Sequence, residues 1–89
     1  IINLKNIIKI MPTNIVAWKL LSIAEARNNN IGLAQLASAE SSFLIGDFNL
    51  AIQFAKKARI SFKKNDPSDI RALDIIFFSY EKINRLEPN

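Results

Sequence analysis

The sequence predicts an all-α fold, an antiparallel array of about four to five helices (an α–α superhelix) whose N-terminal helix is truncated. The chain has 89 residues, of which 49% are hydrophobic, so it can form one core but not a second domain. The chain contains only two glycines and three prolines, so it has few of the turn residues that β-hairpins require. Between these residues, apolar side chains recur at helical spacing. Helices joined by short turns are therefore expected throughout.

The first segment, residues 1–11, is expected to be the end of a preceding helix. Its apolar residues Leu4, Ile7, Ile8 and Met11 have helical spacing. Asparagines and lysines interrupt it, so it lacks the continuous apolar core of a signal peptide or a transmembrane span. The chain begins inside this pattern and without an initiator methionine, which we interpret as the sign of a fragment of a longer protein.

Residues 12–45 are expected to form one helix pair. Asn14 can cap a helix that runs to Arg27, and its apolar face is expected to contain Trp18, Leu21, Ile23, Ala24 and Ala26. Three asparagines at 28–30 break that helix, because asparagine tolerates left-handed backbone conformations. The second helix, over 31–45, is rich in alanine and serine. Such small side chains let neighbouring helices approach closely, which suits the middle of a stack.

Residues 46–89 are expected to form a second pair. Asp47 can cap the third helix, and Phe48 directly after it can make a staple-like contact further along. A turn that contains Pro67 precedes a fourth helix from about 68 or 69 to 86, in which Asp69 early and Arg85 late complement the helix dipole. The buried stripe of the third helix is predicted to contain Leu50, Ala51, Phe54, Ala55, Ala58 and Phe62.

The residue types that are absent from the chain limit the classes of function that it can have. The chain has no cysteine and no histidine, which removes disulfides, thiol chemistry, the usual zinc ligands and the commonest general base. Its eight acidic residues are expected at helix starts or on mixed faces rather than in an apolar pocket. No glycine-rich phosphate loop is present. We therefore predict a chain that is not an enzyme and has no metal or cofactor of its own.

Two junctions indicate a helical repeat. The segment that starts at Asn30 and the one that starts at Asp47, 17 residues later, share a polar cap, a large apolar residue, a variable residue and then Leu-Ala. That shift is half of the roughly 34-residue period of tetratricopeptide repeats, which stack helices into surfaces that hold other proteins. A helix break before Trp18 and a Gly-Asp-Phe turn are also typical of these repeats. The positions that define the repeat are Pro12, Trp18, Ala34, Gly46, Asp47, Phe48, Ala51, Ala58 and Pro67.

Four runs between residues 12 and 76 go beyond the generic repeat: Ala17-Trp18-Lys19-Leu20-Leu21-Ser22-Ile23-Ala24, Gly32-Leu33-Ala34-Gln35-Leu36-Ala37-Ser38-Ala39-Glu40, Gly46-Asp47-Phe48 and Ile70-Arg71-Ala72-Leu73-Asp74-Ile75. On these runs, the chain resembles the C-terminal tetratricopeptide region of the periplasmic BepA-like zinc metallopeptidases. Two positions depart from the family pattern, since asparagines at 28–30 replace a Gly-Asp turn and Glu25 stands where an aromatic residue is common.

This resemblance implies a docking role in the periplasm. The family carries its zinc in an HExxH helix of a separate N-terminal peptidase domain, so no catalytic or metal residue carries over to this histidine-free chain. The repeat region would pack beside the peptidase domain, influence access to its cleft, recruit substrates and contact the outer-membrane β-barrel assembly machinery. Two alternatives remain open: a scaffold of an unrelated cytosolic assembly and, less favoured, a basic nucleic-acid-binding adaptor.

Partner-binding residues are expected on exposed faces of the first helix of each pair. If those helices lie on the concave side of the array, their exposed side chains would face the partner. For the lysines, a solvated helix face is the alternative interpretation. The candidates are Val16, Lys19, Ile23 and Arg27 on the first helix and Gln53, Lys56 and Lys57 on the third.

The fourth helix is predicted to need a covering partner. Apolar side chains surround most of its circumference, so part of the surface of Ile75, Ile76, Phe77 and Phe78 should contact the rest of a parent chain, a second copy or a target. A homodimer through this helix is one expected consequence. The alternative is that these side chains simply form the core of the bundle.

A net charge of +4 raises nucleic acid or an anionic membrane as rival partners. The basic residues cluster at Lys56, Lys57, Arg59, Lys63 and Lys64. However, the nearby phenylalanines fall on the buried spacing, so they offer no platforms on which bases could stack. Nucleic acid is therefore not expected as a partner.

Overall fold

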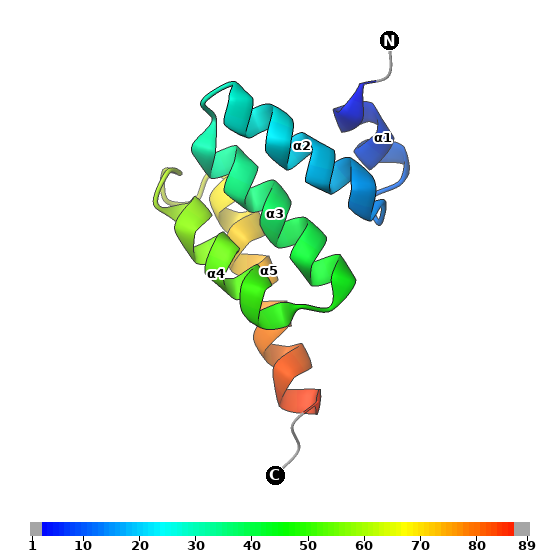
Figure 1. The fold of residues 1–89 in the computed structure, drawn as a ribbon. Coiled ribbons are helices and arrows are strands. Elements are labelled where there is room, and N and C mark those ends of the chain that lie inside the picture. The colour runs from blue at the N-terminus through cyan, green and yellow to red at the C-terminus, as the bar shows by residue number, and fades with distance from the viewer. Residues whose placement is uncertain (1–2, 87–89) are drawn as a thin grey trace.

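The computed structural model describes residues 3–86, which form five α-helices joined by short turns (Figure 1). No strand occurs in this part of the chain, so the predicted all-α array of about five helices is confirmed. Expectations that concern residues 1–2 and 87–89 lie outside the described residues. The helices are α1 (Leu4–Ile10), α2 (Ile15–Arg27), α3 (Ile31–Ile45), α4 (Phe48–Arg59) and α5 (Pro67–Leu86).

Helix ends form where local chemistry predicts them. The side chains of Asn14 and Asp47 accept hydrogen bonds of 3.0 and 3.2 Å from backbone N–H groups three residues further on, and so cap α2 and α4. Asn29 and Gly46 have φ angles of 66° and 96°, the left-handed conformation that ends a helix. Asn30 caps α3 by position alone, since its side chain makes no capping hydrogen bond. The predicted breaks are thus confirmed.

Each helix packs on the next one along the chain, and α3 lies between α2 and α4 with α5 behind (Figure 1). Within residues 3–86, α2 comes close to neither α4 nor α5. The helices therefore form an open array rather than a closed bundle. The array is elongated, with extents of 49 × 27 × 18 Å.

Small side chains dominate the core. Ile75, with 1% of its surface exposed, is the largest fully buried apolar residue. Because alanine fills little space, the helix backbones can approach closely, which agrees with the role predicted for the small residues. The alanines that are completely buried where α3, α4 and α5 meet are Ala39, Ala51, Ala55, Ala58 and Ala72.

The predicted stripe of α4 is wrong at one position and incomplete at another. Leu50 is exposed rather than buried, and Ile52 is buried instead. Since α3 and α5 both cover α4, its buried arc is wide, and Leu50 lies at the edge of that arc. Phe62 packs against the core from the turn after α4 rather than from the helix. The aromatic contact of Phe48 runs backwards to Phe43 of α3, with ring centroids 5.5 Å apart.

A hydrogen bond fastens the junction that precedes α2. The indole Nε1 of Trp18 donates to the carbonyl oxygen of Pro12 at 2.8 Å. Among the described elements, α1 contacts α2 alone, and it has no buried residue of its own. The N-terminal helix is therefore attached to the array mainly through this junction and one side of α2.

Candidate interaction surfaces

One exposed face of α2 carries four of the predicted partner-binding residues, Val16, Lys19, Ile23 and Arg27. Val16 and Ile23 are 64% and 49% exposed. Leu20, which the sequence interpretation missed, is also exposed. It completes a line at 16, 20, 23 and 27 that we call the α2 stripe, because spacings of four, three and four place side chains on one side of a helix. Leu20 could have been predicted from the sequence, because it lies four residues after Val16 and therefore on the same side of the helix.

The opposite side of α2 is bonded to α3. The hydroxyl of Ser22 donates to the carbonyl oxygen of Ala34 at 2.8 Å and lies 2.6 Å from the hydroxyl of Ser38. The buried residues of α2 are Ala17 and Glu25, whereas Ile23 and Ala26, expected on its apolar face, are exposed. The α2 stripe is therefore not used in holding α2 to α3, and its apolar side chains face solvent.

The candidates on α4 are exposed but separate from the α2 stripe. Gln53, Lys56 and Lys57 lie on a helix that α3 keeps apart from α2 (Figure 1). The Nζ atom of Lys56 donates to the hydroxyl of Tyr80 on α5 at 3.3 Å and lies 5.8 Å from the centre of its ring. Lys56 therefore belongs to a surface shared by α4 and α5.

On α5, the structure divides the predicted apolar interface. Ile75 is buried in the core, so its expected place at the surface is wrong, and Ile76 is half-buried against the same core. Phe77 and Phe78 are 62% and 45% exposed, and their rings meet edge to face. Consecutive residues of a helix point in directions about 100° apart, so four in a row cannot share one face.

Most of the exposed apolar surface of α5 is instead a line of residues, of which the sequence-based prediction of the interface included only Phe77. Spacings of three, four and three residues place them on one side of the helix. That side lies opposite the buried residues Ala72, Ile75 and Ser79. We call this line the α5 stripe; it consists of Ile70, Leu73, Phe77 and Tyr80, each between 39% and 62% exposed.

Two ion pairs join α5 to its neighbours. Arg71 donates two hydrogen bonds of 2.7 Å to Glu40 of α3, and Arg59 of α4 donates one of 2.8 Å to Asp69. The Glu40 and Asp69 side chains are only 9% and 3% exposed. The expectation that acidic residues lie at helix starts or on mixed faces is confirmed for Asp69, in the first turn of α5, but is wrong for Glu40 and Glu25, which are buried within their helices. Arginine partners make burial of the first two carboxylates tolerable.

One member of each ion pair has a shifted pKa that favours its charged form. The hydrogen bond from Arg59 is the largest influence on Asp69 and, with a backbone N–H from Asn65, outweighs burial to hold the pKa of Asp69 below its usual value. The hydrogen bonds to Glu40 raise the pKa of Arg71 above its usual range. Neither shift moves a group toward neutral pH, where general acid–base catalysts operate.

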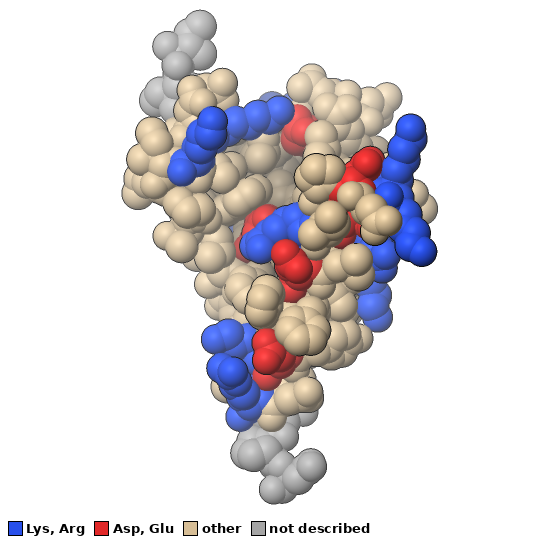
Figure 2. Space-filling model, turned by 180° about the vertical axis from the view of Figure 1, so that it is seen from behind, with Lys and Arg blue, Asp and Glu red and all other residues tan. Residues whose placement is uncertain are grey.

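Basic side chains gather along the edge of the molecule that carries α4 and the α4–α5 turn, at the right of Figure 2. Lys57, Lys63 and Lys64 are exposed there. The nearby Phe54 and Phe62 pack against the core, as the sequence predicts. These two phenylalanines therefore offer no exposed ring beside the lysines.

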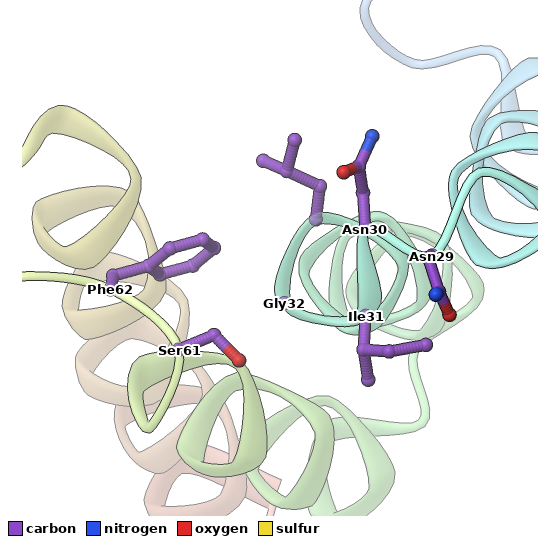
Figure 3. A pocket seen from close by; sticks show the side chains of 7 residues that line it. Asn29, Asn30, Ile31, Gly32, Ser61 and Phe62 are labelled. Atoms are coloured by element: carbon purple, nitrogen blue, oxygen red, sulfur yellow. The ribbon is translucent and has the colours of Figure 1, made fainter.

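A shallow hollow of about 310 Å³ lies where the start of α3 meets the α4–α5 turn (Figure 3). The two segments touch because position 32 is glycine: a Cβ added there would lie 2.5 Å from the Cβ of Ser61. Ser61 and Phe62 point toward α3 across the hollow. Its lining offers amide, hydroxyl and apolar groups and no charged side chain, and consists of Asn29, Asn30, Ile31, Gly32, Leu33, Ser61 and Phe62.

Within residues 3–86, no three metal-ligating side chains come together. None of the helices in that range is both long enough and apolar enough to span a bilayer.

The geometry thus defines an open α-helical array with two exposed apolar stripes on different helices. Comparison with family models, curated proteins and solved structures gave no match to this chain.

Proposed function

We propose that the chain is a non-catalytic protein-interaction module that holds an amphipathic helix of a partner on the α2 stripe. The supporting observation is the stripe itself, three exposed apolar side chains on a helix already bonded to its neighbour through its other side. Anchors at i, i+4 and i+7 are the spacing at which one helix docks along another. Lys19 beside the stripe and Arg27 at its end favour a partner helix with acidic residues along its edges.

The family resemblance supports a more particular form of this proposal. In it, the module is the C-terminal docking and substrate-recruiting domain of a periplasmic zinc metallopeptidase, and its partners are the parent peptidase domain and outer-membrane assembly components. The zinc would belong to that peptidase domain. A scaffold of a cytosolic assembly is the alternative.

The gene separates these two forms. A reading frame that encodes a signal peptide and an HExxH motif ahead of Ile1 is expected for the peptidase form. A frame that encodes neither would overturn the peptidase and periplasmic assignments and leave the interaction role standing.

The interaction role is tested with a designed peptide. The probe is a helical peptide with leucines at i, i+4 and i+7 and glutamates on both sides of that line, titrated into ¹⁵N-labelled protein. We expect shifts of the α2 amide signals with a dissociation constant on the order of 100 µM. The same peptide with lysines in place of the glutamates should bind several-fold more weakly, because Lys19 and Arg27 would repel it.

Two matched variants locate the binding face. Ile23→Glu adds one negative charge within the α2 stripe and should abolish the shifts, whereas Asn84→Glu adds one on exposed α5 and should leave them unchanged. The proposal is wrong if the acidic peptide shifts no α2 amide or if Ile23→Glu binds as well as the unmodified chain.

The exposed Lys57, Lys63 and Lys64 supply the one observation in favour of a nucleic-acid adaptor. That function requires binding to a labelled DNA duplex that weakens steeply between about 50 and 200 mM salt. We expect no such binding, since Phe54 and Phe62 beside these lysines pack against the core and offer no surface on which bases could stack.

A further inference from the structure

The α5 stripe has the spacing of a helix–helix seam. Ile70, Leu73, Phe77 and Tyr80 follow the three-four-three pattern by which two helices interlock side chains along a shared line. No other helix in residues 3–86 covers them, because α3 and α4 pack on the opposite side of α5. These are large side chains, and Phe77 is the most exposed of them.

The two edges of this stripe carry opposite charges. On the α4 side, the ammonium group of Lys56 lies against Tyr80. On the other side, helical spacing places Asp74 and Glu81 next to the stripe, with Arg71 and Arg85 further round the helix. Figure 2, which views the molecule from the α5 side, accordingly shows acidic and basic side chains next to one another there. The charged residues directly beside the stripe are thus Lys56 on one edge and Asp74 and Glu81 on the other.

We propose that the α5 stripe binds the same stripe of a second copy of this chain, with the two α5 helices parallel about a two-fold axis. In that arrangement the Lys56 edge of each copy faces the acidic edge of the other. Glu81 directly follows Tyr80, which Lys56 already contacts, so Lys56 and Glu81 of the other copy lie at the same height along the seam. An antiparallel pair would instead bring like charges together on both edges.

The α5 stripe has opposite charges directly beside it on its two edges, so two copies of the same surface complement each other. This favours a second copy of the chain over an unrelated helix as the partner. The contact also stands apart from the α2 stripe, since α2 comes close to neither α4 nor α5 in the described residues. Loss of peptide binding on α2 would therefore leave the dimer intact, and loss of the dimer would leave peptide binding intact.

Sedimentation velocity of the full chain between about 5 and 500 µM tests the association. The 10.0 kDa chain is expected to shift toward about twice that mass with a dissociation constant on the order of 100 µM, since a seam of this length makes a small interface. Phe77→Glu should weaken the dimer at least tenfold. Val16→Glu, the matched change on the α2 stripe, should leave it unchanged. Far-UV circular dichroism of both variants checks that they fold.

Charge reversal tests the parallel arrangement. Lys56→Glu and Glu81→Lys should each weaken the dimer several-fold, and the two together should restore it, because only then do opposite charges face each other again. The chain contains no cysteine, so Asn84→Cys introduces a single thiol. Residue 84 lies four residues after Tyr80 and therefore continues the α5 stripe by one helical turn. Parallel helices bring the two thiols together, and oxidation should give a covalent dimer.

Four results would overturn the proposal: a strict monomer at 500 µM, a dimer indifferent to Phe77→Glu, a double charge reversal that does not recover association, or failure of the Asn84→Cys chain to cross-link. A monomer would mean that the α5 stripe is covered by a helix of another protein and not by a second copy of this chain. A dimer without charge recovery or cross-linking would mean that the copies are not parallel.

Discussion

Removing Arg71 is expected to destabilise the fold more than removing its partner Glu40. The Glu40 side chain is 9% exposed, whereas that of Arg71 is 45% exposed. Arg71→Leu leaves a carboxylate without two hydrogen bonds of 2.7 Å in a place that water hardly reaches. Glu40→Leu leaves a guanidinium group that can turn to solvent.

The magnitudes follow from that difference. A buried charge left without its partner costs about 3–5 kcal/mol, and because Glu40 keeps a little exposure we expect about 2–3 kcal/mol for Arg71→Leu. Glu40→Leu should cost about 1 kcal/mol or less, since the leucine gains apolar burial between α3 and α5. The double variant should be within about 1 kcal/mol of the unmodified chain, because apolar side chains of similar size replace buried ion pairs at little cost.

Urea unfolding followed by far-UV circular dichroism measures all three. With a denaturant slope of about 1 kcal/mol per M for a chain of this size, the midpoint of Arg71→Leu should fall by about 2 M. Equal losses for the two single variants would refute the reasoning, and so would a double variant as unstable as Arg71→Leu. Either result would mean that the unpaired carboxylate is not the source of the cost.

Three further predictions concern the turns and the second ion pair. Gly32→Ala should lower stability by about 1–3 kcal/mol because its Cβ would lie 2.5 Å from the Cβ of Ser61, and Ser61→Gly in the same chain should recover most of that loss in thermal melts. Gly46→Ala should cost about 1–2 kcal/mol through its φ of 96° alone, since the space around it is open; D-alanine at that position, introduced by chemical synthesis, should be tolerated. Because the pKa of Asp69 is lower in the folded chain, its carboxylate stabilises the fold above the unfolded-state value of about 4, and this contribution is lost as the pH falls through the folded-state value. Asp69→Asn should therefore flatten the acid side of the stability profile, and parallel profiles for the two chains between about pH 2 and 6 would contradict this.

The helix boundaries could be predicted because their causes are local. Asn14 and Asp47 cap through groups three residues away, and Asn29 and Gly46 end helices through their own backbone angles. None of these depends on how the helices pack.

The surfaces were harder to predict because they depend on which side of each helix its neighbours cover. The apolar run of α5 gave no indication that Ile75 would face α3 and α4 while Phe77 faced solvent. Glu40 and Arg71 are 31 positions apart, and only packing of α5 on α3 brings them together. The exposed positions of α2 could be anticipated because helical spacing alone defines a line once one face is known to be buried.

The alanine core has a consequence for how the chain can change over time. Five of the seven buried residues where α3, α4 and α5 meet are alanines, and a larger side chain at any of them would have to push two backbones apart. Substitution at the alanine positions is therefore restricted in size, whereas the larger core residues Leu36 and Ile75 could be shortened only by leaving a cavity. Variation is left to the outer faces of α2 and α5, where a change of side chain alters what the array can hold without altering the array itself.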